Sequence, residues 1–240
     1  MVFHSLNREL EIAHVLLEQR QSRLSLLHRR AKRLGWATAL SQAAFTGCAA
    51  PLLRREAAAQ RAAICRQFGL DSSPIPKSVV LRVPSVNDER AVAALIAWTP
   101  CAVLVFGTRL IRKGVLVRTG APFLNMHAGI TPRYRGSHGA YWAALEGRPE
   151  FAGVTVHLVD AGIDTGAIVA QATIEVSSQD NFTTLPYRQL AAGVPLLAAA
   201  ARAARDGTLT TRASIDPAPS ALWHHPTLGQ YLRGRLSGVR

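Results

Sequence analysis

The sequence predicts an α/β fold: Rossmann-like, with a largely parallel sheet flanked by helices, an N-terminal helical extension and an irregular C-terminal tail. Between residues 78 and 176, short apolar runs alternate with segments of helical periodicity, which is typical of parallel sheets. The residues before this part are basic and helical in pattern, and proline, glycine and arginine dominate from Asp206 onward. We therefore predict a basic helical region over 1–73, an α/β domain over 74–205 and a tail over 206–240.

The composition is that of a globular protein with a strong positive charge. The 240 residues are 48% hydrophobic and 18% charged, which suffices for one substantial core. The net charge of +13 favours an anionic partner such as tRNA, a membrane surface or a phosphorylated substrate. The three cysteines are widely spaced, so they indicate neither a disulfide framework nor a paired metal site. Since the first residues also lack an apolar signal segment, we expect a cytoplasmic protein.

The first expected element is an amphipathic helix over residues 8–34. Leucine and alanine recur there at steps of three, four and seven, with arginine and glutamine between them. Its leucine stripe should dock on the protein while its basic face meets solvent, and peripheral membrane contact is the alternative. The following stretch, 36–53, contains Ser41, Gln42 and Pro51, and is too polar for a spanning helix of about 20 apolar residues.

The remaining elements follow in order along the chain. A helical region at 54–68 leads to a proline-containing linker, after which the alternation of strands and helices begins. Strands are predicted at 78–83, 102–106, 122–126, 153–159 and 168–176, and helices at 88–98, 137–146 and 185–205. The last helix contains Pro195, where we expect a kink or a restart. The tail should be loosely structured, with one docked patch at 222–231.

The first cluster of unusual polar residues follows the strand predicted at 122–126. It contains Asn125 and His127, and continues into a loop with Pro132 and Gly136. The carboxyl ends of parallel strands face the crevice where ligands bind, and residues two apart on a strand project the same way. Asn125 and His127 should therefore reach into that crevice together.

The second cluster is the loop at 157–166, which follows another apolar strand. Asp164 lies there between Gly162 and Gly166, where the backbone can approach a ligand closely. An aspartate that only closes the turn is an equal alternative on this pattern. Phosphate-loop and dinucleotide glycine motifs are absent from the sequence, and the histidine spacing fits no familiar zinc pattern, so we expect no metal.

Taken together, these residues resemble the formyl transferase family, which includes glycinamide ribonucleotide transformylase, methionyl-tRNA formyltransferase and the amino-sugar N-formyltransferases. The resemblance covers residues 79–176. It rests on three features: Asn125-x-His127, the Pro132-x-x-x-Gly136 loop, and an Asp164-x-Gly166 loop at the family's usual distance from the histidine.

The resemblance implies an enzyme that transfers the formyl group of 10-formyltetrahydrofolate to a primary amine, with Asn125, His127 and Asp164 as catalytic residues. The formyl oxygen becomes an oxyanion in this chemistry, and Asn125 and a protonated His127 would donate hydrogen bonds to it. Asp164 would carry the proton exchange and would raise the pKa of His127, which keeps that ring cationic near neutrality. His157 would either orient the aspartate loop or be a buried histidine of the core.

The resemblance also implies a folate pocket lined by two loops. The expected cofactor-binding residues are Phe106, Gly107, Thr108, Leu110, Val159, Asp160 and Gly162. Acceptor contacts are expected from Tyr134, Arg135 and Ser137. The alternatives are an exposed loop tip for Tyr134 and Arg135, and a helix N-cap for Ser137.

Two departures from the family bear on the acceptor. Family members begin with a strand and a glycine-containing loop, which holds the substrate phosphate in the glycinamide ribonucleotide enzymes, whereas this chain opens with basic segments of helical pattern. The residues after Val176 indicate helix and loops rather than a tRNA-binding β domain, which disfavours tRNA. We expect a small phosphorylated amine, either an amino-sugar nucleotide or a molecule like glycinamide ribonucleotide. The alternatives are a catalytically inactive polyanion- or membrane-binding protein and a formyltetrahydrofolate hydrolase, and the oligomeric state is not predicted.

Overall fold

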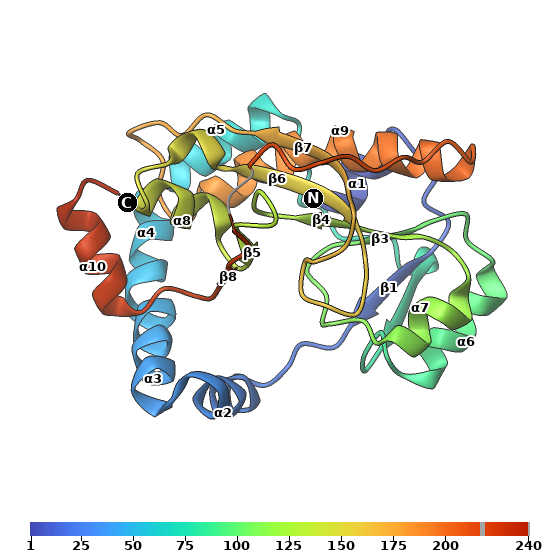
Figure 1. Cartoon of the computed structure of the whole chain (residues 1–240), viewed down its shortest axis with the longest axis horizontal. Helices are drawn as coiled ribbons and strands as arrows, with labels where there is room; N and C mark the ends of the chain where they lie inside the picture. The colour runs from blue at the N-terminus through green and yellow to red at the C-terminus, as the bar shows by residue number, and fades with distance from the viewer. Residues whose placement is uncertain (217–218, 240) are drawn as a thin grey trace.

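The computed structural model describes residues 1–216 and 219–239, and its centre is a four-stranded sheet in the order β3-β4-β6-β7 (Figure 1). The strands are β3 (Val103–Val105), β4 (Phe123–His127), β6 (Gly153–Leu158) and β7 (Ile168–Thr173). Helices flank this sheet, so the predicted α/β class is confirmed. The sheet is mixed, because β3–β4 is parallel whereas β4–β6 and β6–β7 are antiparallel. The loop between β6 and β7 contains no crossover helix, and a parallel neighbour would need one.

The N-terminal part contributes a strand that the sequence pattern did not predict. β1 (Val15–Glu18) pairs in parallel with β2 (Val80–Val83). The single helix predicted over 8–34 is therefore wrong: α1 (Val2–Asn7) ends before this strand and α2 (Arg23–Leu34) begins after it. A short apolar run fits a helical stripe and a buried strand equally well, and here a strand distant in sequence supplies the partner.

A helical connection joins β1 to β2. It consists of α2, α3 (Trp36–Ala44), the π-helical turn η1 (Phe45–Ala49), α4 (Ala50–Glu56) and α5 (Ala58–Gln67), followed by the 3-10 turn η2 (Lys77–Val79). The helical region predicted at 54–68 is confirmed by the last helices of this set. β1, these helices and β2 thus form a parallel strand–helix–strand unit in which basic helices occupy the crossover. Its strand pairing spans the domain boundary predicted at residue 73.

Three of the later helices lie close to their predicted ranges, namely α6 (Glu89–Trp98), α8 (Gly139–Leu145) and α9 (Leu185–Arg205). The structure also contains α7 (Lys113–Thr119), the 3-10 turn η3 (Pro149–Phe151) and α10 (Leu228–Leu236), which were not predicted as helices. The N-cap of α6 is Asp88, whose side chain accepts a hydrogen bond from the Arg90 N–H at 3.0 Å. α9 continues through Pro195 without a restart, and Pro195 lies on the exposed side of this helix.

The C-terminal segment docks on the loop that follows β4. β8 (Leu222–Trp223) pairs in parallel with β5 (Arg135–Gly136), and Tyr231 of α10 is buried. The docked patch predicted at 222–231 is confirmed, and a capping box of Thr227 and Gln230 extends it into a helix.

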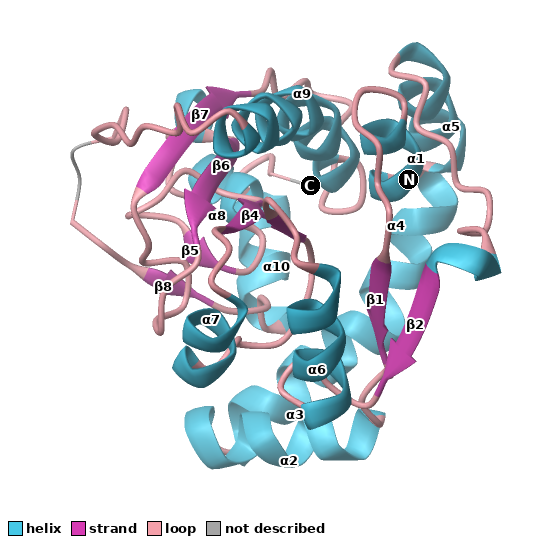
Figure 2. Cartoon of the chain, turned by 90° about the vertical axis from the view of Figure 1, so that its right-hand side faces the viewer, coloured by secondary structure: helices cyan, strands magenta, loops and turns pink. Residues whose placement is uncertain are grey.

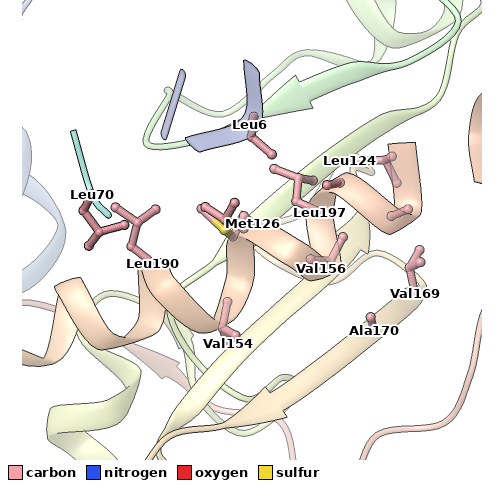
Figure 3. Close-up of a cluster of buried hydrophobic side chains, with 13 residues drawn as sticks. Leu6, Leu70, Leu124, Met126, Val154, Val156, Val169, Ala170, Leu190 and Leu197 are labelled. Carbon is pink, nitrogen blue, oxygen red and sulfur yellow. The ribbon is translucent and has the colours of Figure 1, made fainter. Parts of the chain in front are cut away.

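The principal core lies between α9 and the sheet, as the close-up in Figure 3 shows. α9 covers one face of β4, β6 and β7 (Figure 2). Apolar side chains of α6 and α7 pack with Val103 and Val105 of β3 in a separate cluster. Leu124 and Met126 of β4 pack with Leu197 of α9 in the principal core. Since successive side chains of a strand alternate between its faces, Asn125 and His127 point to the other face.

Candidate active site

Asp164 is the centre of a cluster of polar side chains at the end of β4. The loop between β6 and β7 carries it with a positive φ of 51°, a conformation that aspartate tolerates better than most residues. Its Oδ2 accepts a hydrogen bond from the Gly136 N–H at 2.9 Å and lies 3.3 Å from Nδ1 of His127. Its Oδ1 lies 3.2 Å from Nδ2 of Asn125 and 3.5 Å from Nε2 of His157. The three residues predicted to be catalytic are therefore brought together.

These contacts keep Asp164 ionised. Burial alone would raise the pKa of this carboxyl, but the contact with His157, the charge that His127 carries when it is protonated, and the Gly136 N–H together hold its pKa below the ordinary value. The same network supports the role predicted for His157 in orienting the aspartate.

The Asn125 amide is held in one orientation by its neighbours. Nδ1 of His157 donates to the Leu158 carbonyl at 2.7 Å, and its Nε2 lies 3.0 Å from Nδ2 of Asn125. The Asn125 amide also donates to Oδ1 of Asp164 at 3.2 Å. This amide is thus engaged within the protein, and it would have to turn a hydrogen toward a substrate oxygen to serve it.

His127 differs from the prediction in its protonation. Burial lowers the pKa of this ring, and the opposing effect of the Asp164 carboxylate is smaller, so the ring is neutral near pH 7 rather than cationic. Its Nε2 lies 2.7 Å from the Tyr134 carbonyl, to which it donates. The Nδ1 lone pair of His127 then faces the Asp164 carboxylate, and this contact is repulsive. A proton bound between Nδ1 and Oδ2 of Asp164 would convert it into an ion pair.

One cavity of about 910 Å³ contains this cluster. Asn125, His127 and Asp164 line it, together with Ser137 and Gly136. All of the residues predicted for the folate pocket also line it, namely Phe106, Gly107, Thr108, Leu110, Val159, Asp160 and Gly162. Asp160 closes its own loop by accepting hydrogen bonds from the Gly162 N–H at 3.0 Å and the Thr165 hydroxyl at 2.7 Å.

The other predicted acceptor residues behave differently from one another. Tyr134 is fully buried, does not line this cavity, and donates its hydroxyl to Glu146 at 2.8 Å, which contradicts the acceptor contact predicted for it. Burial is also the main reason why the pKa of Tyr134 is raised. Arg135 donates to the Ile163 carbonyl at 3.1 Å and so supports the aspartate loop. Ser137 lines the cavity, and the N-cap of α8 is His138 instead.

Sequence reasoning missed the link between β1 and the first folate loop. The Glu18 carboxylate accepts hydrogen bonds from the N–H groups of Val86 at 2.7 Å and Arg109 at 3.1 Å. The Arg109 guanidinium donates to the carbonyls of Pro84 at 2.7 Å and Gln19 at 2.6 Å. The signal in the sequence was Glu18 at the end of the apolar run 15–17. This signal indicates a loop contact only when the run is known to be a strand.

Basic residues of α2 form a second missed part of the site. The cavity is also lined by Arg20 and by Arg29, Arg30 and Arg33 of α2, and His224 and His225 of the C-terminal segment border it. Within the described ranges, no group of three or more histidine, cysteine, aspartate or glutamate side chains is arranged to hold a metal ion. None of the helices described is both long and apolar enough to cross a bilayer.

Comparison with known proteins connects this site to a family. The formyl transferase family model matches residues 43–200. Methionyl-tRNA formyltransferase of Anaeromyxobacter dehalogenans is 36% identical over 145 residues, which cover 60% of this chain and 46% of that protein. The enzyme of that name from Pseudomonas syringae is 34% identical over 140 residues, covering 57% and 44%. The chain thus spans about half the length of the curated relatives it matches.

A solved structure supports the same fold. Phosphoribosylglycinamide formyltransferase from Streptococcus pneumoniae superimposes with a TM-score of 0.52 at 19% identity, over 84% of this chain and 91% of that one. At this identity the likeness is one of fold alone. The family match, however, includes β4, the Asp164 loop and most of α9, and on this basis the chain belongs to the formyl transferase family.

Proposed function

We propose that this protein is a cytoplasmic N-formyltransferase of one-carbon metabolism. It would transfer the formyl group of 10-formyltetrahydrofolate to a primary amine of a small phosphorylated acceptor, an amino-sugar nucleotide or a molecule like glycinamide ribonucleotide. The observation that carries this proposal is the convergence of Asn125, His127 and Asp164 on one cavity. The free state of Cys48, Cys65 and Cys101 is consistent with a reducing compartment.

The loop residues of the cavity fit a flat, amphipathic donor. Phe106 and Leu110 are 51% and 52% exposed, which is unusual for large apolar side chains, and both line the cavity. Backbone N–H and C=O groups of the same loop and of the loop after β6 can bind the polar edge of a pterin. An apolar slot bordered by backbone polar groups is the type of site that a folate requires.

The chemistry needs one proton to move while the formyl carbon changes its nitrogen partner. A bond forms from the acceptor nitrogen to the formyl carbon, the bond from that carbon to the folate nitrogen breaks, and one proton passes from the first nitrogen to the second. Asp164 is ionised, and it can accept the acceptor's proton and share it with Nδ1 of His127 at 3.3 Å. The ion pair so formed would lie beside Asn125, whose amide can turn a hydrogen toward the formyl oxygen.

A second acceptor, aminoacyl-tRNA, is favoured by different observations. A methionyl-tRNA formyltransferase is 36% identical to this chain over 145 residues, and the net charge of +13 suits a polyanion. In favour of the small acceptor, the cavity that contains Asn125 and His127 is also lined by arginines of α2, which can bind a phosphate group. We therefore prefer the small acceptor and include the tRNA in the test.

The test is turnover of 10-formyltetrahydrofolate with a panel of amines: glycinamide ribonucleotide, several nucleotide-linked amino sugars and methionyl-tRNA. We expect one small amine to support tetrahydrofolate formation, and His127→Ala and Asp164→Asn to lower kcat by roughly 10²–10⁴-fold. His28→Ala and Asp206→Asn change exposed residues outside the cavity and serve as matched controls.

Three other outcomes would contradict the proposal. Turnover with methionyl-tRNA alone would establish the tRNA acceptor. Formate release without any amine would identify a hydrolase. A folded protein that neither binds folate nor turns over would be a binding protein that has kept the fold without the activity.

A further inference from the structure

One part of the cavity wall is formed by a single face of α2. The lining residues of this helix are Leu26, Arg29, Arg30, Arg33 and Leu34. Their spacing of three and four residues places them on one side of the helix. The arginines therefore belong to the cavity, whereas Arg23 of the same helix lies outside its lining.

These guanidinium groups lack anionic partners in the part of the chain that the structure describes. None of the ion pairs there involves Arg29, Arg30 or Arg33. Arg30 is half-buried, and burial lowers its pKa. A partly desolvated cation without a counter-ion is unfavourable, and an anion from outside would relieve this cost.

The carboxylates that line the cavity are already engaged elsewhere. Glu18 is hydrogen-bonded to the Val86 and Arg109 N–H groups, Asp160 to Thr165, and Asp164 to the catalytic cluster. The α2 arginines lie close enough to two imidazoles for their charges to act on them: Arg33 and Arg30 on His224, and Arg30 on His225. Burial, together with the arginine charges, lowers the pKa of both His224 and His225, so both rings are neutral near pH 7. Neutral imidazoles can donate hydrogen bonds to an anion.

We propose that Arg29, Arg30 and Arg33 bind the diphosphate group of the acceptor. Guanidinium groups bind phosphate oxygens in bidentate fashion, and three cationic side chains match the charge of a diphosphate better than that of one phosphate. The chain after β1 continues with Gln19, Arg20 and Gln21, and has no glycine there that would let the backbone approach a phosphate closely. Recognition of the anion therefore comes from the side chains of α2.

The role of this diphosphate as part of the acceptor rests on the proposed function, but anion binding does not. Isothermal titration of the full chain with inorganic pyrophosphate near 150 mM salt measures the site directly. Arg30→Gln and Arg33→Gln should each weaken pyrophosphate binding about tenfold, because each removes a charge-assisted contact. Arg23→Gln removes the same charge from the same helix outside the cavity, and should leave the dissociation constant within about twofold.

Equal weakening by Arg23→Gln and Arg30→Gln would overturn the proposal, because it would show that the charge of α2 in general attracts the anion. Binding of inorganic phosphate as tight as that of pyrophosphate would overturn the diphosphate assignment. Folate binding, measured in parallel, should be unchanged in Arg30→Gln and shows that the variant is folded.

Two further arms separate this site from the proposed function. Pyrophosphate binding with the expected variant pattern, but without formyl transfer to any amine, would support the anion site and refute the enzyme. Formyl transfer that is unaffected by Arg30→Gln and Arg33→Gln would support the enzyme and refute the role of these arginines in binding the acceptor. A third measurement is the competition of tRNA with pyrophosphate. If Arg23→Gln weakens tRNA binding as much as Arg30→Gln does, the arginines of α2 bind a polyanion, and the assignment to a small diphosphate is overturned.

Discussion

Two histidines in contact, His138 and His225, predict a loss of stability in mild acid. Nε2 of His138 lies 2.9 Å from Nδ1 of His225, so one ring donates and the other accepts, and the two rings cannot both be protonated while this contact is kept. Burial, assisted by the charge of His225, lowers the pKa of His138 to about 3. Burial, assisted by Arg30, lowers the pKa of His225 to about 4.

The sign and size of the effect follow from these values. An unfolded histidine titrates near about pH 6.5, so above that pH neither state binds the proton and the full stability is present. Below it, the unfolded chain binds protons that the folded protein excludes, down to about pH 4 for His225 and about pH 3 for His138. Stability falls by about 1.4 kcal/mol per pH unit for each ring, or by about 4 kcal/mol for both at about pH 5.

Urea unfolding followed by circular dichroism at about pH 7, 6 and 5 measures this loss. Burial also lowers the pKa of His127 and His224, so the wild-type slope contains further contributions. His225→Gln removes one titration, and we expect the free energy of unfolding of this variant to fall by about 2 kcal/mol less than that of the wild type between pH 7 and 5. His28→Gln, at an exposed position, is the control. Identical slopes for wild type and His225→Gln would refute the reasoning.

Three further predictions concern the core and the donor loop. Leu197→Ala removes a fully buried side chain of α9 and should lower the free energy of unfolding by about 2–5 kcal/mol in urea; a loss below about 1 kcal/mol would contradict its core position. Gly193→Ala would place a methyl group 2.5 Å from Sδ of Met126, so we expect about 1–3 kcal/mol of destabilisation by the same method, and a neutral effect would contradict it. Glu18→Gln weakens the hydrogen bonds that hold the loop beginning at Phe106. It should raise KM for the formyl donor about tenfold while kcat changes little, and Asp206→Asn is the control. A KM equal to that of the control would refute the role of Glu18 in positioning this loop.

The part of the fold that follows residue 78 was predictable because its elements are defined locally. β4 is a short apolar run that ends in polar residues, and α6 has an aspartate cap and a clear helical period. The three residues proposed to be catalytic could be identified as candidates for the same reason, since Asn125 and His127 directly follow the apolar run and the glycines around Asp164 mark a close loop.

What could not be predicted depends on partners distant in sequence. β1 is a strand only because β2 pairs with it, and the antiparallel position of β7 depends on a loop that carries no helix. The protonation of His127 is a balance between burial and Asp164, and burial is not visible in a sequence. Tyr134 was predicted to contact the acceptor, but it packs into the second core cluster and holds its loop from inside.

Side chains along β4 alternate between the core under α9 and the candidate active site, so the packing of the core determines how the site is placed. A shift of this strand by one residue would turn Leu124 and Met126 into the cavity and bury Asn125 and His127 beneath α9. The apolar contacts with α9 therefore fix the register of β4, and with it the positions of the proposed catalytic groups. Substitutions that loosen this packing should lower the activity before they unfold the protein. Activity would therefore be a more sensitive measure of damage to this core than stability.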